Sequence, residues 1–162
     1  MTTFTLRPLG EGDYGPLYRI AVEFGPKWHR ISRFATSPSS FREALWADVA
    51  IQYIAEVREA NQSIPAAILT VHSVSIRDLV AGLDVVDLGL APAAVVHSAA
   101  QEMARLAFDQ LPVRKLYYSF PEFVGNALAG ADNAVEEGRL IDDIRADGVY
   151  FDRVIIALYR AK

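Results

Sequence analysis

The order of strand-prone and helix-prone segments predicts an α/β (α+β) fold built around a mixed sheet. Three strand-prone runs follow one another in the middle of the chain with short breaks between them, which favours an antiparallel meander. A helical segment then leads from the third run to a fourth, and a crossover of this kind favours a parallel pair. With 162 residues, 52% of them hydrophobic, the chain has the size and composition of one globular domain, residues 1–162.

The first third is predicted to contain a strand, two helices and a long loop. Residues 4–9 alternate apolar and polar side chains, as a half-buried strand does. Asp13 can cap a helix over Tyr14–Phe24, and Ser40 can cap another that runs through Asp48. Between the two helices, a stretch rich in Pro, Ser and Arg has neither helical nor strand periodicity. Long loops in compact domains are often functional.

The centre of the chain is predicted to hold strands, a helix and a further strand. β-branched residues and alternation indicate strands at 51–59, 65–75 and 79–91. Residues Val95–Leu111 carry their apolar side chains on one helical face, and Pro112 follows. A short strand is expected at 113–120, and Pro121 opens a weakly predicted helix over 121–132.

The tail is predicted to form a closing β-hairpin within residues 134–160. Its hinge is Asp147-Gly148, a pair typical of tight turns because glycine adopts positive φ without steric cost. An edge strand of such a hairpin presents unpaired backbone groups, so a homodimer formed through this edge is one expectation.

Composition excludes several classes of function. The net charge of −4 argues against a nucleic-acid partner held by general phosphate attraction. The absence of cysteine excludes disulfides, thiolate catalysis and cysteine-based zinc sites, and the three histidines lack the spacing of a metal site, so no metal is expected. The N-terminus does not resemble a signal peptide, and no apolar run reaches about 18 residues, so a cytoplasmic protein without a membrane partner is expected.

Four segments resemble the Gcn5-related N-acetyltransferase (GNAT) superfamily, and specifically its branch of ribosomal-protein alanine acetyltransferases. They are "TLRPLGEGD", "DLGLAP", "LAFDQLPVRKLYYS" and, most similar of all, "VEEGRLIDDIRADGVYFDRVIIALYR". The resemblance implies a mixed, mostly antiparallel seven-stranded sheet with helices on both faces. It also implies acetyl-CoA as co-substrate, bound in a notch where the fourth and fifth strands splay apart.

The resemblance places the CoA site at the end of the fourth strand, where the pantetheine arm would pair with backbone near Asp87–Leu90. The superfamily cradles the pyrophosphate in a Gln/Arg-x-x-Gly-x-Gly/Ala loop. Here the matching "AAVVHSAAQEM" contains neither glycine nor arginine, so the loop is degenerate. The side chains and backbone expected to contact CoA are those of Leu88, Gly89, Leu90, His97, Ser98 and Ala99.

The resemblance also indicates where an acid and a base would lie. The glutamate of related enzymes falls on Val85, flanked by Asp84 and Asp87, which alternation sends to opposite faces. Asp87 is preferred as the base because it lies nearer the splay, with Asp84 as the other candidate. The superfamily's tyrosine acid falls on Ala129, which leaves Tyr118 on the neighbouring strand as a weak candidate.

Two functions remain open from the sequence. The first is an acyl-CoA-dependent N-acyltransferase in which an amine of a small molecule or peptide attacks acetyl-CoA directly in a ternary complex. Its acceptor would bind beneath the long loop. The loop side chains expected to contact the acceptor are those of Trp28, His29, Arg30, Arg33 and Phe34. The second is a diverged protein of the same fold that has lost acetyl-CoA chemistry and binds another ligand, acts on another substrate or serves as an interaction domain.

Overall fold

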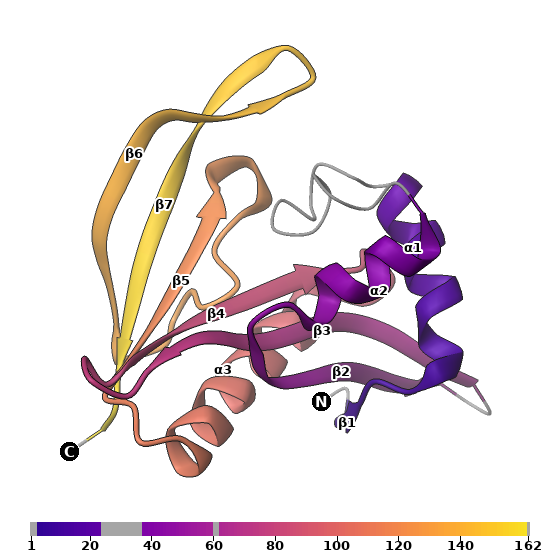
Figure 1. Ribbon diagram of the computed structural model, residues 1–162, viewed down its shortest axis with the longest axis horizontal. Coiled ribbons are helices and arrows are strands. Elements are labelled where there is room, and N and C mark those ends of the chain that lie inside the picture. Colours follow the sequence, from indigo (N-terminus) through magenta and orange to yellow (C-terminus); the bar gives the residue numbers. More distant parts are fainter. Residues whose placement is uncertain (1–2, 24–36, 60–61, 162) are drawn as a thin grey trace.

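A computed structural model describes residues 3–23, 37–59 and 62–161. The described strands form one seven-stranded sheet in the order β1-β2-β3-β4-β5-β7-β6 (Figure 1). The bounds of the strands are β1 Phe4–Pro8, β2 Val49–Glu59, β3 Gln62–Ser75, β4 Val80–Asp87, β5 Lys115–Pro121, β6 Ala134–Ala146 and β7 Val149–Tyr159. The α-helices are α1 Tyr14–Glu23, α2 Pro38–Trp46 and α3 Ala93–Gln110, and single 3-10 turns are η1 Glu11–Asp13 and η3 Glu122–Val124.

The sheet is mixed and mostly antiparallel, which confirms the predicted fold class. Only β4 and β5 pair in parallel, across the α3 crossover, and every other neighbouring pair is antiparallel. The register also confirms the central meander of β2, β3 and β4.

Helices cover both faces of the sheet, and each face has its own core (Figure 1). On one face, Leu83 of β4 belongs to a cluster with Met103 of α3. On the other, Ile68 of β3 belongs to a cluster with Leu17 of α1 and Phe41 of α2. Neighbouring residues of β3 and β4 alternate between these clusters, as the pleat of a strand requires. The sheet therefore separates an α3 face from an α1/α2 face.

Helix α1 begins at Tyr14 as predicted, but the capping residues of α1 and α2 differ from the prediction. Asp13 ends the η1 turn instead of capping α1, and its Oδ2 accepts a hydrogen bond of 2.6 Å from the Gly10 backbone. Ser37, not Ser40, is the N-cap of α2: its hydroxyl accepts from the Ser40 backbone, while the Ser40 hydroxyl lies 3.0 Å from the Ser37 backbone nitrogen. This reciprocal capping box uses both serines, with Pro38 opening the helix.

The predicted helix over 121–132 is wrong. The 3-10 turn η3 is the only helical element in this segment, and the chain continues through Gly125 and Gly130, whose φ angles are +84° and +82°. Both values are outside the right-handed helical region, so each glycine interrupts a helix. The segment is instead a loop in which the Leu128 backbone donates to Asn126 Oδ1.

The terminal hairpin is confirmed. Asp147 and Gly148 have φ angles of +49° and +81°, the pair of positive values that a type I′ turn requires. The hairpin extends beyond the rest of the sheet, and β6 is an edge strand (Figure 1).

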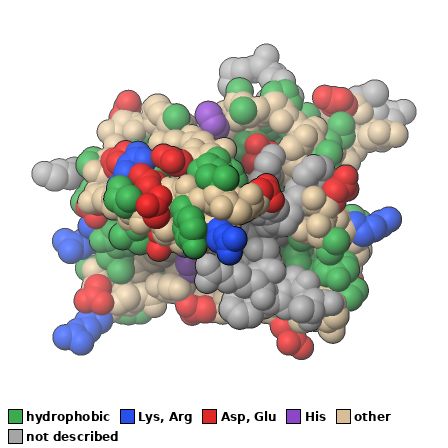
Figure 2. Space-filling view, turned by 90° about the horizontal axis from the view of Figure 1, so that it is seen from above, with side chains coloured by type: hydrophobic (Ala, Val, Ile, Leu, Met, Phe, Trp, Pro, Cys, Tyr) green, Lys and Arg blue, Asp and Glu red, His purple; other side chains and the backbone are tan. Residues whose placement is uncertain are grey.

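On the face seen from above, acidic side chains are spread across the described surface with basic ones between them (Figure 2). No helix in the described ranges is both long and apolar enough to cross a membrane.

Candidate functional site

A gap opens between β4 and β5. Their parallel pairing joins Val80–Leu83 to Lys115–Tyr118 and ends there. β4 nevertheless continues to Asp87, still paired with β3, and β5 continues to Pro121, paired with β7. Residues 84–87 therefore present one backbone edge that has no partner in β5, which leaves peptide groups available to a ligand.

A cavity of about 350 Å³ lies beside this gap on the α3 face. β4 contributes Val85 and Asp87, which point to this face by alternation from Leu83. The rest of the lining comes from the start of α3, from β5 and from the loop that follows η3. These lining residues are Ala93, Val96, His97, Tyr118, Val124, Gly125, Asn126, Ala127 and Ala129.

The candidate base Asp87 and the candidate acid Tyr118 both line this cavity. Asp87 Oδ1 accepts a 2.7 Å hydrogen bond from the Gly89 backbone, which anchors a turn where Gly89 has a φ of +71°. Tyr118 is 1% exposed, and burial raises the pKa of its hydroxyl against the opposing effect of a backbone hydrogen bond with Ala127. Tyr118 therefore stays protonated at neutral pH and can donate a proton or a hydrogen bond.

The residues expected to contact CoA have different surroundings. Of their side chains, only His97 lines the cavity. Ser98 Oγ donates to the Ala94 carbonyl at 2.9 Å, Ala99 is fully buried in the α3 core, and Leu88 packs in the α1/α2 core. Gly89 and Leu90 are exposed in the loop before α3.

The charge around the cavity is unusual for a phosphate site. Among the described residues, the lining includes the carboxylate of Asp87 and no lysine or arginine. Pro92, the N-cap of α3, offers no side-chain cap, so among the described residues the helix N-terminus is a source of positive potential at this lining.

Asp84 lies on the opposite face, as alternation predicted. Its neighbours Leu83 and Val85 belong to the α3 core, whereas Asp84 approaches His72, with 3.5 Å between Asp84 Oδ2 and His72 Nε2. Asp84 is the first β4 residue beyond the last β4–β5 pair, so it lies at the vertex of the gap. Its side chain is 12% exposed.

Two further buried polar residues extend the polar surface around Asp84. Thr70 pairs with Asp84 in the sheet register, and its hydroxyl donates a 3.0 Å hydrogen bond to Gln52 Oε1. The amide nitrogen of Gln52 is buried without a hydrogen-bond acceptor among the described residues. Sequence reasoning missed both, although each is a polar residue between two apolar neighbours in a strand.

The residues expected to bind the acceptor, Trp28, His29, Arg30, Arg33 and Phe34, lie outside the described residues. Within residues 3–23, 37–59 and 62–161, no group of three or more His, Asp or Glu side chains is placed to hold a metal ion.

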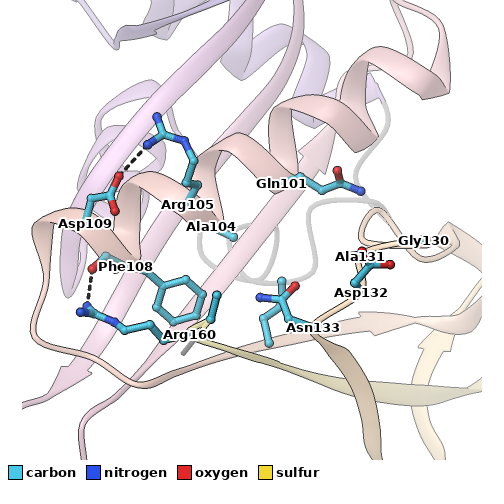
Figure 3. A pocket seen from close by; sticks show the side chains of 12 residues that line it. Gln101, Ala104, Arg105, Phe108, Asp109, Gly130, Ala131, Asp132, Asn133 and Arg160 are labelled. Carbon is cyan, nitrogen blue, oxygen red and sulfur yellow. Dashed lines mark hydrogen bonds and ion pairs between the residues drawn. The ribbon is translucent and has the colours of Figure 1, made fainter.

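A larger cavity, of about 630 Å³, lies farther along α3 and away from the gap (Figure 3). Its cations are already engaged. Arg105 forms ion pairs with Glu102 and Asp109 on its own helix, and Arg160 donates to the carbonyls of Phe108 and Leu111 at the end of α3. These contacts are structural, so we place the candidate site at the gap.

Comparisons with known proteins identify the fold. No protein-family model and no curated protein sequence matches the chain. Among solved structures, a provisionally assigned phosphinothricin N-acetyltransferase matches at 18% identity and a TM-score of 0.73, covering 99% of this chain and 100% of its own. Spermidine N-acetyltransferase from Vibrio cholerae, in complex with CoA and spermine, matches at 16% identity and a TM-score of 0.68, covering 96% and 95%. The chain has the fold of GNAT acetyltransferases, and the branch within that superfamily stays a prediction.

Proposed function

We propose that this chain is an acyl-CoA-dependent N-acyltransferase that transfers an acetyl group from acetyl-CoA to an amine of a small molecule or peptide. The observation that carries the proposal is the gap between β4 and β5, with a cavity on one face and the Asp84 carboxylate at its vertex on the other. This arrangement lets a thioester and an amine approach one point from opposite faces of the sheet. Solved structures of the same fold are N-acetyltransferases, one in complex with CoA and spermine.

The acyl donor would bind through backbone more than through side chains. Unpaired peptide groups of residues 84–87 suit the amides of the pantetheine arm, and the backbone amides at the start of α3 suit the pyrophosphate. His97, at the start of α3, is one of the lining side chains able to donate to a phosphate oxygen.

The reaction needs a neutral amine, because an ammonium has no lone pair to attack with. We assign Asp84 as the base that takes this proton, ahead of Asp87, because Asp84 lies at the vertex of the gap and approaches His72 at 3.5 Å. The amine nitrogen then attacks the thioester carbonyl carbon in the ternary complex, and the carbon–sulfur bond breaks. The departing thiolate takes a proton from Tyr118 or from water.

A diverged protein without acetyl-CoA chemistry is the second candidate. The observation that favours it is the cavity lining, in which the part of the chain that the structure describes supplies the Asp87 carboxylate and no lysine or arginine. Such a lining opposes a pyrophosphate, and residues 93–103, which match the pyrophosphate loop of the superfamily, contain no glycine to bring the backbone close to one.

Thermal unfolding with CoA and with acetyl-CoA separates the two candidates. A ligand at 100 times its Kd stabilises the folded state by about 2.7 kcal/mol, so binding raises Tm measurably. Ala93→Asp should abolish this increase by repelling phosphate, while an acidic residue in the first helical turn leaves the unliganded protein at least as stable. Gln101→Glu, on an exposed position of the same helix, is the matched charge control.

The absence of any Tm increase at millimolar CoA would overturn the first candidate and support the second. When CoA binds, a panel of amines that includes spermidine, spermine and phosphinothricin, followed by release of CoA thiol, identifies the acceptor class.

The β6 edge supports a second proposal, the assembly of two copies of the chain. β6 pairs with β7 on one side only, and its Leu140 and Ile141 are 47% and 69% exposed. Light scattering should give the mass of a dimer, and Ile141→Lys should give that of a monomer. Val22→Lys, at an exposed position of α1, should leave the dimer intact, and a monomeric unaltered protein would contradict the proposal.

A further inference from the structure

A chain of polar groups connects the buried Asp84 carboxylate to solvent on the α1/α2 face. Asp84 Oδ2 lies 3.5 Å from His72 Nε2, and His72 Nδ1 lies 3.0 Å from the Ser73 hydroxyl. The Ser73 hydroxyl in turn donates a 2.7 Å hydrogen bond to Asp48 Oδ2. Solvent exposure rises along this series of polar groups. The side chains of Asp84 and His72 are 12% and 20% exposed, and Ser73 and Asp48 are exposed residues.

Several features of the fold hold these groups together. Gly82, the register partner of His72, lies directly beneath the imidazole: a Cβ there would be 2.5 Å from His72 Cε1 and 2.6 Å from Nε2. The register of β3 and β4 shifts immediately after His72, and Ser73 has a φ of +51°. Asp48, in the turn before β2, has a φ of +57°, and its carbonyl accepts from the Ser73 backbone at 3.1 Å.

Positive φ is uncommon outside glycine, and such backbone outliers concentrate at functional sites. The bulge turns the Ser73 hydroxyl toward Asp48, and the glycine makes room for the ring. His72 can therefore contact Asp84 and Ser73 at the same time.

The direction of these hydrogen bonds determines the state of the ring. Because Asp48 accepts the Ser73 hydrogen, the Ser73 oxygen accepts from His72 and so orders the hydrogen of the neutral imidazole onto Nδ1. Nε2 then presents a lone pair to the Asp84 carboxylate. These two acceptor atoms lie 3.5 Å apart, and one added proton between them allows the contact to shorten into a hydrogen bond.

We infer that His72, Ser73 and Asp48 carry the proton that Asp84 takes from the acceptor ammonium to solvent, an inference that rests on the proposed function. The ammonium loses its proton to Asp84, and His72 Nε2 accepts it from there. His72 releases its Nδ1 hydrogen to Ser73, which passes its own hydroxyl hydrogen to Asp48 and so to water. The ring, 20% exposed, regains its original tautomer by exchange with solvent. His72 is a positioning and relay residue, because it acts through Asp84.

The first test reads the tautomer and needs no activity. Nitrogen-15 NMR of the ring should show the neutral His72 with its hydrogen on Nδ1, and Asp48→Ala should shift it toward Nε2. Asp78→Ala is the matched control, because Asp78 makes an equivalent 2.8 Å contact with Ser75 in the next turn and should leave His72 unchanged. A hydrogen on Nε2 in the unaltered protein would overturn the relay.

The second test uses the amine that the acceptor panel identifies. His72→Ala should lower kcat by about 10²-fold, with the KM for acetyl-CoA unchanged since the cavity is on the other face. Imidazole in solution should restore part of the rate by occupying the space over Gly82, whereas pyrazole, of the same size but a much weaker base, should not. Equal rescue by both, or an unchanged kcat, would reduce His72 to a packing role.

The two tests also separate the relay from the proposed function. If the relay alone is wrong, the protein still acetylates an amine, and His72→Ala leaves its kcat unchanged. A protein that acetylates none of the amines overturns the proposed function, and the catalytic role of the relay with it. If His72→Ala does not fold, the NMR result on the unaltered protein decides.

Discussion

Replacing Gly82 with alanine should destabilise the protein through a steric clash with one side chain, His72. The added Cβ would lie 2.5 Å from His72 Cε1. Carbon atoms in contact settle at about 3.5–4.0 Å, so the ring has to move by roughly 1 Å. Overpacking of this kind costs about 1–3 kcal/mol of unfolding free energy. The displaced ring also lengthens its contact with Asp84, so kcat should fall.

A double-mutant cycle measures this clash by itself. In a His72→Ala background the ring is absent, and alanine in a strand is more stable than glycine by roughly 0.5–1 kcal/mol. Gly82→Ala should therefore stabilise that background, giving a coupling energy of about 1.5 kcal/mol or more between the two positions. Urea unfolding of the four proteins at one pH gives the numbers.

Gly15→Ala in α1, where an added Cβ meets nothing within 4 Å, is the control and should be stabilising. An equal cost of Gly82→Ala in both backgrounds would refute the placement of His72 over Gly82, and with it the geometry on which the relay depends.

Two other predictions concern the N-terminal elements. Ser37→Ala should lower the unfolding free energy by about 1 kcal/mol through loss of the α2 N-cap, as measured by urea unfolding, with the exposed Glu43→Ala of the same helix close to neutral. Arg7 donates hydrogen bonds to Asp13 and Glu56, which lowers the pKa of both carboxyls in the folded protein below 3.8 and 4.5. The two ionised carboxylates stabilise the folded protein fully at pH values above their ordinary pKa values. This stabilisation is lost as the pH falls through their lowered pKa values in the folded protein, because the unfolded chain binds more protons in that range. Arg7→Met should make the unfolding free energy fall less steeply below about pH 4.5. An unchanged pH dependence in this range would show that the contacts of Arg7 with the two carboxylates do not stabilise the protein.

Local signals in the sequence were sufficient where one backbone preference dominated. Asp147-Gly148 specified the hairpin because few other pairs adopt two positive φ values. The Val95–Leu111 pattern located α3 to within two residues at its start, because one apolar face has to be buried.

Prediction failed where two local signals competed. Pro121 favours the start of a helix, but Gly125 and Gly130 interrupt it, and their positive φ decided the outcome. Ser37 and Ser40 are both good N-cap residues. Ser37 is the N-cap because the side chains of Ser37 and Ser40 each accept a hydrogen bond from the backbone N–H of the other.

For the candidate site, alternation along β4 was enough to separate Asp84 from Asp87, because a strand has a strict period of two. It could not show that the Gly89 backbone holds Asp87, nor that pairing with β5 ends one residue before Asp84. Those facts depend on where two strands diverge, and that is set by how each packs on its other neighbour.

The sequence by itself determined the order of the strands, the parallel crossover and the closing turn, since each follows from short-range periodicity or from a residue with a restricted backbone. Only the tertiary structure brought Asp48, Ser73, His72 and Asp84 into one chain of contacts. Their proximity depends on strand register, a bulge and the space above Gly82. Register is a collective outcome of packing on both faces of the sheet, so no local pattern of residues encodes it.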